Sequence, residues 1–561
     1  MDVICHTIPV TEPSDHTGAQ LDHLVRRGWT PEGGQDSILP NHATRWLSAR
    51  TGLVETSTPV APDSALVVGE PRLPDGVRDA LAAVVGTEHV LLGRDDRLGR
   101  AGGMSYVDLM RHRGTGDLAV PDAVVVPADP EQVQRVVELC AEHRIGLVPF
   151  GGGTSVVGGV TASAGDLGAV VVLDLCRLDR LVSVDPVSRL AVLQAGVTAP
   201  DAERMLAAHG LTLGHFPQSF ERATIGGFAA TRSSGQASAG YGRFEDMVEG
   251  LRLATPRGEW RLGVSPASAA GPDLRHLVVG SEGAFGVLTE VTLRVRQRPT
   301  VRRYEGHVLD GWTAGTAAVR ALAQAGVLAD VTRLSDPHET DLAFALSGGW
   351  KTALVRRYLR ARGVADPCLL VLGWEATSAA ELAARRRASL RVLRSARPVT
   401  LGTVIGEKWR HGRFHGPRQR DALLDAGVCV ETLETATYWS NLDALRSAVR
   451  AALVDVLATD GRRPVVACHV SHAYETGASL YFTVLVPRDL DDPLGQWGRA
   501  KAAACAAITA TGGTISHHHA VGVDHAPYLP AEIGPLGVDV LGAVKRELDP
   551  SGVLNPGKLL G

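Results

Sequence analysis

The feature that most constrains this chain is a run of glycines directly after a short apolar segment. Residues 147–159 read Leu-Val-Pro-Phe-Gly-Gly-Gly-Thr-Ser-Val-Val-Gly-Gly. The apolar start predicts a buried strand that ends where the first three glycines begin. Glycines lack the Cβ atoms that would keep a ligand away from the main chain. Exposed N–H groups beside the hydroxyls of Thr154 and Ser155 form a concave anion site, so we expect a phosphate or a pyrophosphate to bind here.

Two better-known phosphate-binding loops do not fit this segment. The Walker loop ends in Gly-Lys-Ser/Thr, which is absent. The Rossmann spacing requires glycine where Val156 stands. A plain glycine-rich turn between two strands is the alternative, but five glycines in nine residues would weaken any regular element.

Size and composition exclude several classes of protein. A chain of 561 residues is too long for one core, so we expect two or more domains. A net charge of −4 offers no basic surface for nucleic acid or an anionic membrane. No apolar run is long enough to span a bilayer, and the polar N-terminus does not resemble a signal peptide. Seven cysteines without a C-x-x-C pair predict a reducing, cytoplasmic location without structural disulfides.

Composition divides the chain into four regions. Residues 1–115 are polar and proline-rich, and we expect them to pack on the main body. Residues 116–299 contain glycines and short β runs, which favour an α+β domain. Residues 300–510 alternate longer helices with strands and are interpreted as a cap domain for the substrate. Residues 511–561 form a short tail that is dense in motifs.

Hydrophobic periodicity predicts individual elements within these regions. The predicted strands cover residues 123–127, 147–150, 169–175 and 190–195, and a hairpin pairs residues 464–470 with 479–486. The predicted helices cover residues 41–50, 316–325, 379–396 and 442–458. Another helix is expected to begin with Asp129 as N-cap and Pro130 in its first turn. The basic run Arg385–Arg387 is interpreted as a solvated helix face.

Two further segments are rich in glycine and other small residues. Residues 224–227 read Thr-Ile-Gly-Gly, and residues 280–286 read Gly-Ser-Glu-Gly-Ala-Phe-Gly. Together with the first loop they lie within 140 residues of sequence. Three such segments indicate main chain wrapped around one large, flat ligand, and a cofactor with a pyrophosphate and a ring system suits them best.

These segments, followed by Leu-Asp-Pro-Ser-Gly-Val-Leu-Asn-Pro-Gly-Lys at residues 548–558, resemble the vanillyl-alcohol-oxidase-type family of FAD proteins. The resemblance implies an α+β fold, with a PCMH-type FAD-binding domain of two subdomains and an α+β cap domain. The first segment would hold the FAD pyrophosphate, the other two would line the adenine and isoalloxazine rings, and the tail would return to the flavin domain. No histidine or cysteine lies in or beside residues 151–159, so FAD is expected to bind non-covalently.

The same resemblance assigns a set of residues to FAD. They are Pro149, Gly151, Gly152, Gly153, Thr154, Ser155, Gly158, Pro217, Ser219, Thr224, Gly226, Gly227, Ser234, Gly280, Glu282, Gly283, Gly286, Val287 and Asn555.

Residues 512–519 read Gly-Gly-Thr-Ile-Ser-His-His-His. Three adjacent histidines in extended or irregular chain cannot face one way, so at most two share a site. A metal ion would need ligands from elsewhere, and no paired cysteine or carboxylate motif supplies them, so no metal is predicted. A solvated histidine cluster is one alternative. Proton transfer near a flavin is favoured, because imidazole titrates near neutral pH.

This histidine motif resembles the signature of the alkyldihydroxyacetonephosphate synthase (alkylglycerone-phosphate synthase) family, and the likeness runs from about residue 85 to the end. It implies a small-molecule substrate whose acyl group is exchanged for a fatty alcohol through a flavin N5 adduct, without net redox change. It also implies a homodimer. The residues that it assigns to catalysis are His215, Arg333, Arg420, Tyr481, His517, His518 and His519.

Two of these assignments have a structural alternative. Strand alternation places the side chain of Tyr481 opposite those of Leu480 and Phe482, where it can face a pocket, but a core tyrosine is the alternative. Arg420 resembles an arginine that holds substrate phosphate, for which a guanidinium is well suited. A surface position on a helix is equally compatible with its sequence context.

The chain departs from the family pattern after the histidines. Ala520 and Val523 stand where the pattern has Gly and a Lys or Arg. The lost cation weakens the case for a phosphate-bearing substrate, so an altered substrate is open. A redox FAD enzyme of the D-2-hydroxyacid dehydrogenase or alcohol oxidase type, and a flavin-binding protein without catalysis, are the alternatives.

Overall fold

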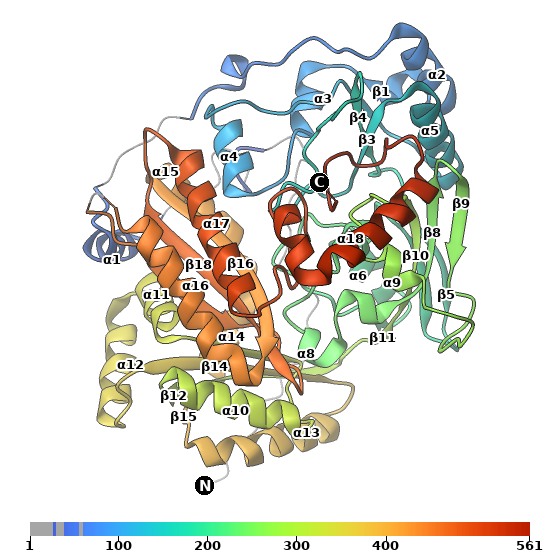
Figure 1. Cartoon of the computed structure of the whole chain (residues 1–561). Coiled ribbons are helices and arrows are strands. Elements are labelled where there is room, and N and C mark those ends of the chain that lie inside the picture. The colour runs from blue at the N-terminus through green and yellow to red at the C-terminus, as the bar shows by residue number, and fades with distance from the viewer. Residues whose placement is uncertain (1–25, 30–38, 55–59, 460, 561) are drawn as a thin grey trace.

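The chain forms an α+β structure with two groups of sheets, as expected (Figure 1). The computed structural model describes residues 26–29, 39–54, 60–459 and 461–560. Strands before residue 300 build small sheets, and strands after it build one seven-stranded sheet. Among the described residues, no helix combines the length and the apolar composition that a membrane span requires. The predicted domain boundaries stay a prediction.

The glycine loop leaves the carboxyl end of a buried strand. Four strands form the first sheet, in the order β1 (Val90–Leu91), β2 (Ala123–Val125), β4 (Val170–Asp174) and β3 (Gly146–Phe150). β2, β4 and β3 run parallel, whereas β1 is antiparallel to β2. Helix α5 (Pro130–His143) connects β2 to β3 and begins as predicted, because the Asp129 carboxylate accepts from Gln132 N at 2.8 Å. Since β3 is buried and ends at Phe150, the loop starts at a fixed point.

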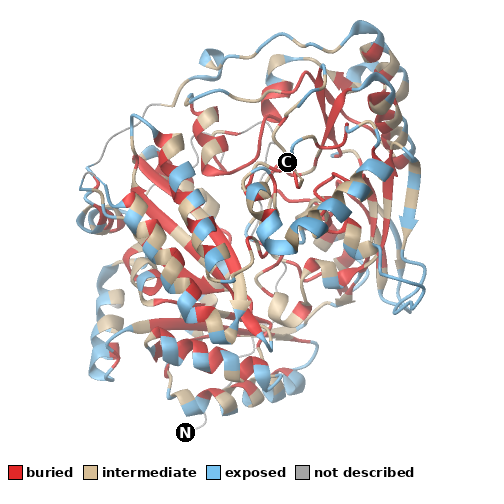
Figure 2. Ribbon diagram, in the orientation of Figure 1, coloured by how far each residue is buried: buried red, intermediate tan, exposed pale blue. Residues whose placement is uncertain are grey.

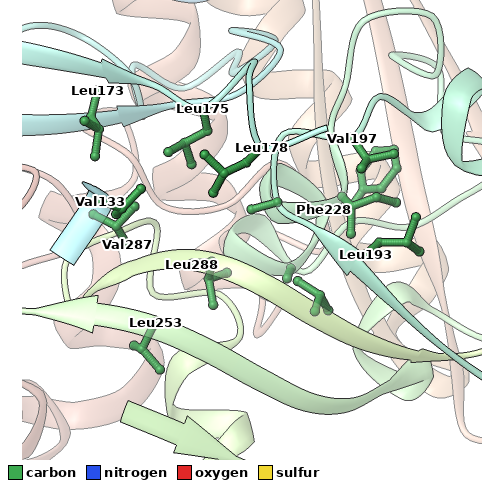
Figure 3. Packing of buried hydrophobic residues seen from close by; sticks show 14 of the residues in the cluster. Val133, Leu173, Leu175, Leu178, Leu193, Val197, Phe228, Leu253, Val287 and Leu288 are labelled. Carbon is green, nitrogen blue, oxygen red and sulfur yellow. The ribbon is translucent and has the colours of Figure 1, made fainter. Parts of the chain in front are cut away.

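A second sheet is antiparallel and packs against the first. Its strands are, in spatial order, β5 (Leu181–Asp185), β6 (Leu190–Gln194), β10 (Val287–Arg294), β8 (Val248–Thr255) and β9 (Gly258–Leu262). β7 (Leu211–Thr212) and β11 (Arg296–Gln297) form a separate pair. Figure 3 shows how side chains of α5, β4, β6, β8 and β10 meet in one core. Burying each Leu or Val there contributes about 1.5–3 kcal/mol, which fixes the loops that leave these strands.

The seven-stranded sheet is antiparallel throughout. Its order is β15 (Val399–Gly402), β12 (Val301–Asp310), β14 (Pro367–Ala376), β13 (Val331–Ser335), β17 (Val465–Val470), β18 (Gly477–Pro487) and β16 (Val428–Tyr438). β14 shows the alternation, since Leu370 and Leu372 pack into one core and Leu369 and Val371 into another. The predicted hairpin is confirmed as β17 and β18.

Helices cover both faces of this sheet. The helices on one face are α10 (Trp312–Gln324), α13 (Ala379–Leu393), α16 (Leu442–Leu457) and α17 (Pro493–Ala510). The helices that pack into the core of the other face are α11 (Pro337–Ser347), α12 (Gly349–Ala361) and α14 (Thr403–Gly412). Figure 2 shows α12 at the edge of the molecule, largely exposed.

The remaining helices connect or cover these sheets. They are α1 (Asn41–Thr51), α2 (Asp75–Val85), α3 (Arg94–Gly99), α4 (Tyr106–His112), α6 (Ala199–Ala207), α7 (Ile225–Thr231), α8 (Ser238–Tyr241), α9 (Arg275–Val278), α15 (Gly416–Asp425) and α18 (Leu529–Leu548). The sequence pattern predicted α1, α10, α13 and α16 to within a few residues, but not α18.

The interpretation of the basic run in α13 is wrong in part. Arg385 and Arg386 are half-buried, and only Arg387 of the three is exposed. Arg385 pairs with Asp330 at 2.8 Å, and Arg386 pairs with Glu305 at 2.9 Å. These carboxylates lie on the sheet side of the helix, so two of the three cations tie α13 to the sheet.

Candidate functional site

A cavity of about 890 Å³ lies between the two groups of sheets. The glycine-rich segments form one wall, and side chains of β13, β16, β17, β18 and the histidine loop form the opposite wall. All residues that the sequence assigned to FAD line this cavity except Gly158, Gly280, Val287 and Asn555. Whether each lining residue contacts the cofactor stays a prediction.

The glycines allow the three segments to touch. A Cβ on Gly152 would lie 1.9 Å from the Arg222 carbonyl oxygen, and a Cβ on Gly151 would lie 2.3 Å from Thr224 Oγ1. A Cβ on Gly283 would come within 2.8 Å of the Pro149 ring. Any other residue at these positions would force the segments apart, so the cradle exists only because it is built from glycine.

The lining of this cradle fits the predicted FAD. Its surface is main chain with the hydroxyls of Thr154, Ser155 and Ser219 nearby. Ser234 Oγ and Gln236 Oε1 also lie in this wall, and among the described residues these two buried atoms have no hydrogen-bond partner. Buried polar atoms normally make hydrogen bonds, so these two atoms are suited to bind a polar ligand.

Asn555 lies outside the cavity and links the first and third glycine-rich segments. Its side-chain amide donates to the carbonyl oxygens of Gly159 at 3.1 Å and Glu282 at 2.6 Å. Its backbone pairs with Leu147 on β3. Arg26 braces the same loop from the N-terminal region, donating to the carbonyl oxygen of Gly153 at 3.0 Å. Of the other three residues outside the lining, Val287 is in the core, and Gly158 and Gly280 adopt positive φ.

The histidine loop is held by a buried carboxylate that the sequence reasoning missed. Glu434 on β16 accepts hydrogen bonds from the backbone N–H groups of His517 at 2.6 Å, His518 at 3.0 Å and His519 at 2.8 Å. Burial by itself would raise the pKa of Glu434, but the neighbouring histidines and the backbone donors hold this pKa well below its usual range. The loop is therefore fixed by a charged acceptor inside the protein.

A second carboxylate fixes the next turn of the same loop. Glu282 accepts from the backbone N–H groups of Val521 at 2.8 Å and Gly522 at 2.8 Å. Burial raises the pKa of Glu282 to about 7, against the effect of these donors. Glu282 lies in the third glycine-rich segment, so the histidine loop is clamped to both walls of the cavity.

The three histidines divide as expected from their spacing. His518 and His519 line the cavity, whereas His517 does not. His517 Nδ1 lies 2.9 Å from His518 Nδ1, and its Nε2 lies 2.7 Å from the Tyr474 hydroxyl. Burial lowers the pKa of His518 to about 3 and that of His519 to about 4, although Glu434 opposes this. Both rings are therefore neutral at pH 7.

Tyr481 faces the cavity, as strand alternation predicted. It lies directly across the sheet from Glu434 on one side and His469 on the other. Its ring centre is 4.9 Å from that of His469 and 6.0 Å from that of His518, and both pairs are nearly parallel. Burial raises the pKa of Tyr481 to about 12, so the phenol keeps its proton at neutral pH.

The two predicted arginines differ in their partners. Arg333 donates to Ser335 Oγ at 2.9 Å, to Glu339 Oε1 at 2.9 Å and toward His469 Nδ1 at 3.1 Å. Its guanidinium is therefore used within the protein. Arg420 also lines the cavity, but its nearest carboxylate contact, to Glu431, is 3.6 Å long, and its Nε has no partner among the described residues. Arg420 is the cation with donors available to a ligand.

His215 lies behind the wall rather than in it. Its side chain is buried between Phe228 and Phe244, and its Nε2 lies 3.0 Å from Ser233 Oγ. Burial lowers its pKa to about 3. Because Ser233 lines the cavity, this hydroxyl connects His215 to the site.

The histidine loop has a further histidine beside it, which the search for paired cysteine or carboxylate motifs did not address. His472, just after β17, brings its ring close to those of His517 and His518, and ligating nitrogen atoms of the three lie within 4.8 Å of one another. His472 Nε2 is 3.0 Å from the carbonyl oxygen of Gly235, and its Nδ1 is 2.8 Å from Ser471 Oγ. These contacts occupy the His472 nitrogens without a metal. The absence of a metal stays a prediction.

Sequence reasoning also missed other residues of the site. Glu339, His469, His472, Tyr474 and Glu434 were not singled out. One signal was available, because the predicted strand and the residues after it contain Cys-His-Val-Ser-His at 468–472. A second was the pair of glutamates three apart in the apolar strand Val428–Tyr438. Trp29 of the N-terminal region also reaches the cavity.

Comparisons with known proteins agree with this geometry. Residues 121–262 match a family model described as an FAD binding domain, and residues 298–559 match the C-terminal domain of FAD linked oxidases. A solved p-cresol methylhydroxylase structure shares the fold, with a TM-score of 0.64, 17% identity, and coverage of 88% of this chain and 99% of that one.

Two further comparisons are more specific. A solved structure of alkyldihydroxyacetonephosphate synthase superposes with a TM-score of 0.82 at 26% identity, covering 96% of this chain and 98% of that one. Alkyldihydroxyacetonephosphate synthase of Trypanosoma brucei brucei is 31% identical over 493 residues, which cover 86% of this chain and 80% of the relative. The cofactor of the protein described here is FAD. With its glycine cradle and clamped histidine loop, the chain belongs to the alkyldihydroxyacetonephosphate synthase family of FAD-dependent enzymes.

Proposed function

We propose that this enzyme exchanges the acyloxy group of an acyl-dihydroxyacetone phosphate, or of a closely related ketone ester, for the alkoxy group of a long-chain alcohol, and releases the acyl group as a carboxylic acid. The observation that carries the proposal is the arrangement of Tyr481, His518 and His519 around one end of the cavity. This end lies on the wall opposite the glycine cradle. FAD held by the glycine-rich segments would supply an electron-accepting ring for the reaction.

His518 is proposed to take the proton from the substrate carbon. Its ring is neutral and buried, and one nitrogen, Nδ1, is already engaged with His517. The other nitrogen, Nε2, is the one left for a ligand in the cavity. When Nε2 accepts a proton, the ring becomes cationic, and the carboxylate of Glu434, which lies 3.6 Å from His518 Nδ1, stabilises this charge.

Tyr481 and Arg420 are proposed to hold the polar end of the substrate. The Tyr481 phenol is protonated at neutral pH and donates a hydrogen bond to a substrate oxygen. Arg420 supplies guanidinium donors for an anionic group. Apolar residues of α1, α11 and α14 line the far part of the cavity, where alkyl chains would lie: Ala43, Leu47, Leu342, Leu346, Val404 and Ile405.

The departure at Val523 supports an altered anion site. Val523 is 45% exposed and packs on Gly158, so it provides no cation at the place where the family pattern has one. The cations that could bind a phosphate are then Arg420 and the other cationic lining residues Lys408 and Arg413, and a substrate with a smaller anion is compatible with the same cavity.

A redox reaction is the second candidate, because residues 298–559 match a family of FAD linked oxidases. One experiment separates the two. The purified enzyme is incubated with an acyl-dihydroxyacetone phosphate and a fatty alcohol, and ether product is sought by mass spectrometry. In parallel, D-2-hydroxyacids are added without oxygen, and the flavin absorption is followed. Ether product without bleaching supports our proposal. Bleaching by a hydroxyacid with no ether product would show that the enzyme is a dehydrogenase.

The homodimer and the cytoplasmic location that the sequence suggested stay proposals. Light scattering of the purified enzyme tests the first, and fractionation of the producing cell tests the second. A monomer, or recovery outside the cytoplasm, would contradict them.

A further inference from the structure

The wall of the cavity that carries Tyr481 holds a second imidazole that the proposed reaction does not use. His469 on β17 lines the cavity and is 8% exposed. Its Nδ1 lies 2.8 Å from Glu339 Oε1, and its ring packs nearly parallel to that of Tyr481. Among the described residues, no group forms a hydrogen bond with the other ring nitrogen, Nε2. One nitrogen is therefore held by a carboxylate, and the other is left for a ligand.

The contacts of Nδ1 decide which ring nitrogen carries the proton. Nδ1 faces the Glu339 carboxylate at 2.8 Å and a guanidinium nitrogen of Arg333 at 3.1 Å. The carboxylate is the nearer group and can accept the proton. The Arg333 guanidinium already donates to the same carboxylate at 2.9 Å and to Ser335 Oγ at 2.9 Å. Nδ1 of His469 therefore carries the proton and donates it to Glu339, which leaves a lone pair on Nε2.

The surroundings keep this imidazole neutral and its carboxylate ionised. Burial lowers the pKa of His469, and Arg333 lowers it further, although Glu339 opposes both. Burial by itself would raise the pKa of Glu339, but Arg333 and His469 hold this pKa far below its usual value. A neutral imidazole that is oriented by an ionised carboxylate is suited to take a proton from a hydroxyl group.

Glu339 places the imidazole beside the apolar part of the cavity. Its position is fixed near the start of α11, where its backbone N–H donates to Asp336 Oδ1 at 2.8 Å. Leu342, Ala343 and Leu346 of the same helix also line the cavity. These residues lie three, four and seven positions after Glu339, so all four share one face of the helix. An alkyl chain along this face would end with its head group near the imidazole.

We propose that His469 is the base that takes the hydroxyl proton of the incoming long-chain alcohol. This inference rests on the proposed function, in which an alkoxy group replaces an acyloxy group. The C–O bond to the acyloxy group breaks, and its electron pair leaves with the carboxylate. The alcohol oxygen forms the new C–O bond, and its proton passes to His469 Nε2 and then to solvent. Nothing is oxidised or reduced overall. His518 keeps its separate task at the substrate carbon.

The test compares two nucleophiles that attack the same carbon. Because departure of the carboxylate can reverse, the full-length, FAD-loaded enzyme should also exchange a labelled fatty acid into acyl-dihydroxyacetone phosphate. A carboxylate has no proton to lose at neutral pH, whereas an alcohol has one. His469→Gln should therefore slow ether formation by about 10²–10⁴-fold and change the rate of acid exchange little. A long-chain thiol, which is more acidic than the alcohol, should reduce the deficit of the variant.

His307 supplies a matched control. It is another buried histidine beside a glutamate, with its Nε2 3.7 Å from Glu305 Oε2, but it does not line the cavity. His307→Gln should leave both rates unchanged. Flavin absorption and circular dichroism show whether each variant is folded. If His469→Gln does not fold, Glu339→Gln replaces it in the comparison and should likewise slow ether formation more than acid exchange.

Two results would overturn the proposal. One is ether formation by His469→Gln at the wild-type rate. The other is an equal loss of ether formation and acid exchange, which would mean that the imidazole acts only by packing against Tyr481. Failure of the proposed function gives a different result, because the wild-type enzyme itself would then form no ether, and the role of His469 would fall with it.

Discussion

The wall of the cavity that carries the glycine loop presents main chain, whereas the wall that carries Tyr481 presents side chains. The first is made by segments that follow each other within residues 149–286, and each segment is recognisable by itself. The second gathers Arg333, Thr432, His469, Tyr481 and His518 from four strands and a distant loop. A main-chain wall depends on the absence of side chains. A side-chain wall depends on the partners that hold each group in place.

The largest expected effect is on the main-chain wall. In Gly152→Val the new side chain would clash with the Arg222 carbonyl oxygen, and this backbone atom cannot easily move away. We expect a cost of about 3 kcal/mol or more and a protein that no longer retains FAD. Absorption near 450 nm after gel filtration measures this (the wavelength is roughly that of any flavin). Gly168→Ala is the control, because a Cβ there meets nothing within 4 Å. A yellow Gly152→Val protein of normal stability would show that this close approach is not needed.

Substitutions in the side-chain wall should lower kcat without loss of FAD. Tyr481→Phe and His518→Ala remove groups that face the cavity without touching the glycine cradle. We expect each variant to keep its flavin and to lose about 10²–10⁴-fold in kcat. Tyr528→Phe is the matched control, since its hydroxyl makes only a 3.5 Å contact with Ala502 O. Loss of flavin from either variant would mean that the side-chain wall is also needed to bind FAD. An unchanged kcat would mean that the replaced group is not catalytic.

The clamp behind the histidines should matter for stability. Glu434→Ala leaves the buried N–H groups of His517, His518 and His519 without an acceptor. We expect the free energy of unfolding to fall by about 3 kcal/mol. Glu434→Gln keeps one acceptor oxygen and should cost less. Urea unfolding measures both variants. Equal stability of Glu434→Ala and the wild type would show that water replaces the carboxylate.

Acid should destabilise the folded protein through His518 of the side-chain wall. The pKa of His518 is about 3 in the folded protein, below the value near 6.5 of an unfolded chain. Above about pH 6.5 both states are neutral and this group has no effect. As the pH falls below that, only the unfolded state binds the proton, so stability drops by about 2 kcal/mol at pH 5.

Melting temperatures between pH 8 and pH 5 test this pH dependence. The depressed pKa of Glu434 acts in the same direction, but only below about pH 4.5. His518→Gln should give a flatter profile than the wild type. Parallel profiles for the two proteins would show that His518 does not titrate in the way we describe.

The smallest expected effect concerns a departure from the family pattern. Ala520 has φ +73°, a left-handed conformation that an alanine adopts at a cost of about 1 kcal/mol. Ala520→Gly should remove this strain, and the added freedom of the unfolded chain offsets part of the gain. We expect a stabilisation below about 1 kcal/mol in thermal unfolding. Ala383→Gly, on the exposed side of α13, is the control and should destabilise by about that amount. A loss of stability in Ala520→Gly would show that the methyl group packs usefully.

The main-chain wall could be predicted because its information is local. The strand before residue 151, the helix cap at Asp129 and the hairpin of β17 and β18 each follow from a few neighbouring residues. The orientation of Tyr481 followed from strand alternation in the same way. The role of Glu434 could not be predicted, because its partners lie about 85 residues further along the chain. The inward position of Arg385 and Arg386 likewise depends on carboxylates of other strands.

The sequence by itself determined the composition of the cradle, since only glycine permits segments to approach within the distances found at Gly151 and Gly152. It also determined that the three histidines cannot face one way. The tertiary structure decided which of them line the cavity and which of the two predicted arginines has donors available to a ligand. The physical reason is that burial and hydrogen bonding of a polar group are set by whatever packs against it, and those neighbours come from distant parts of the chain.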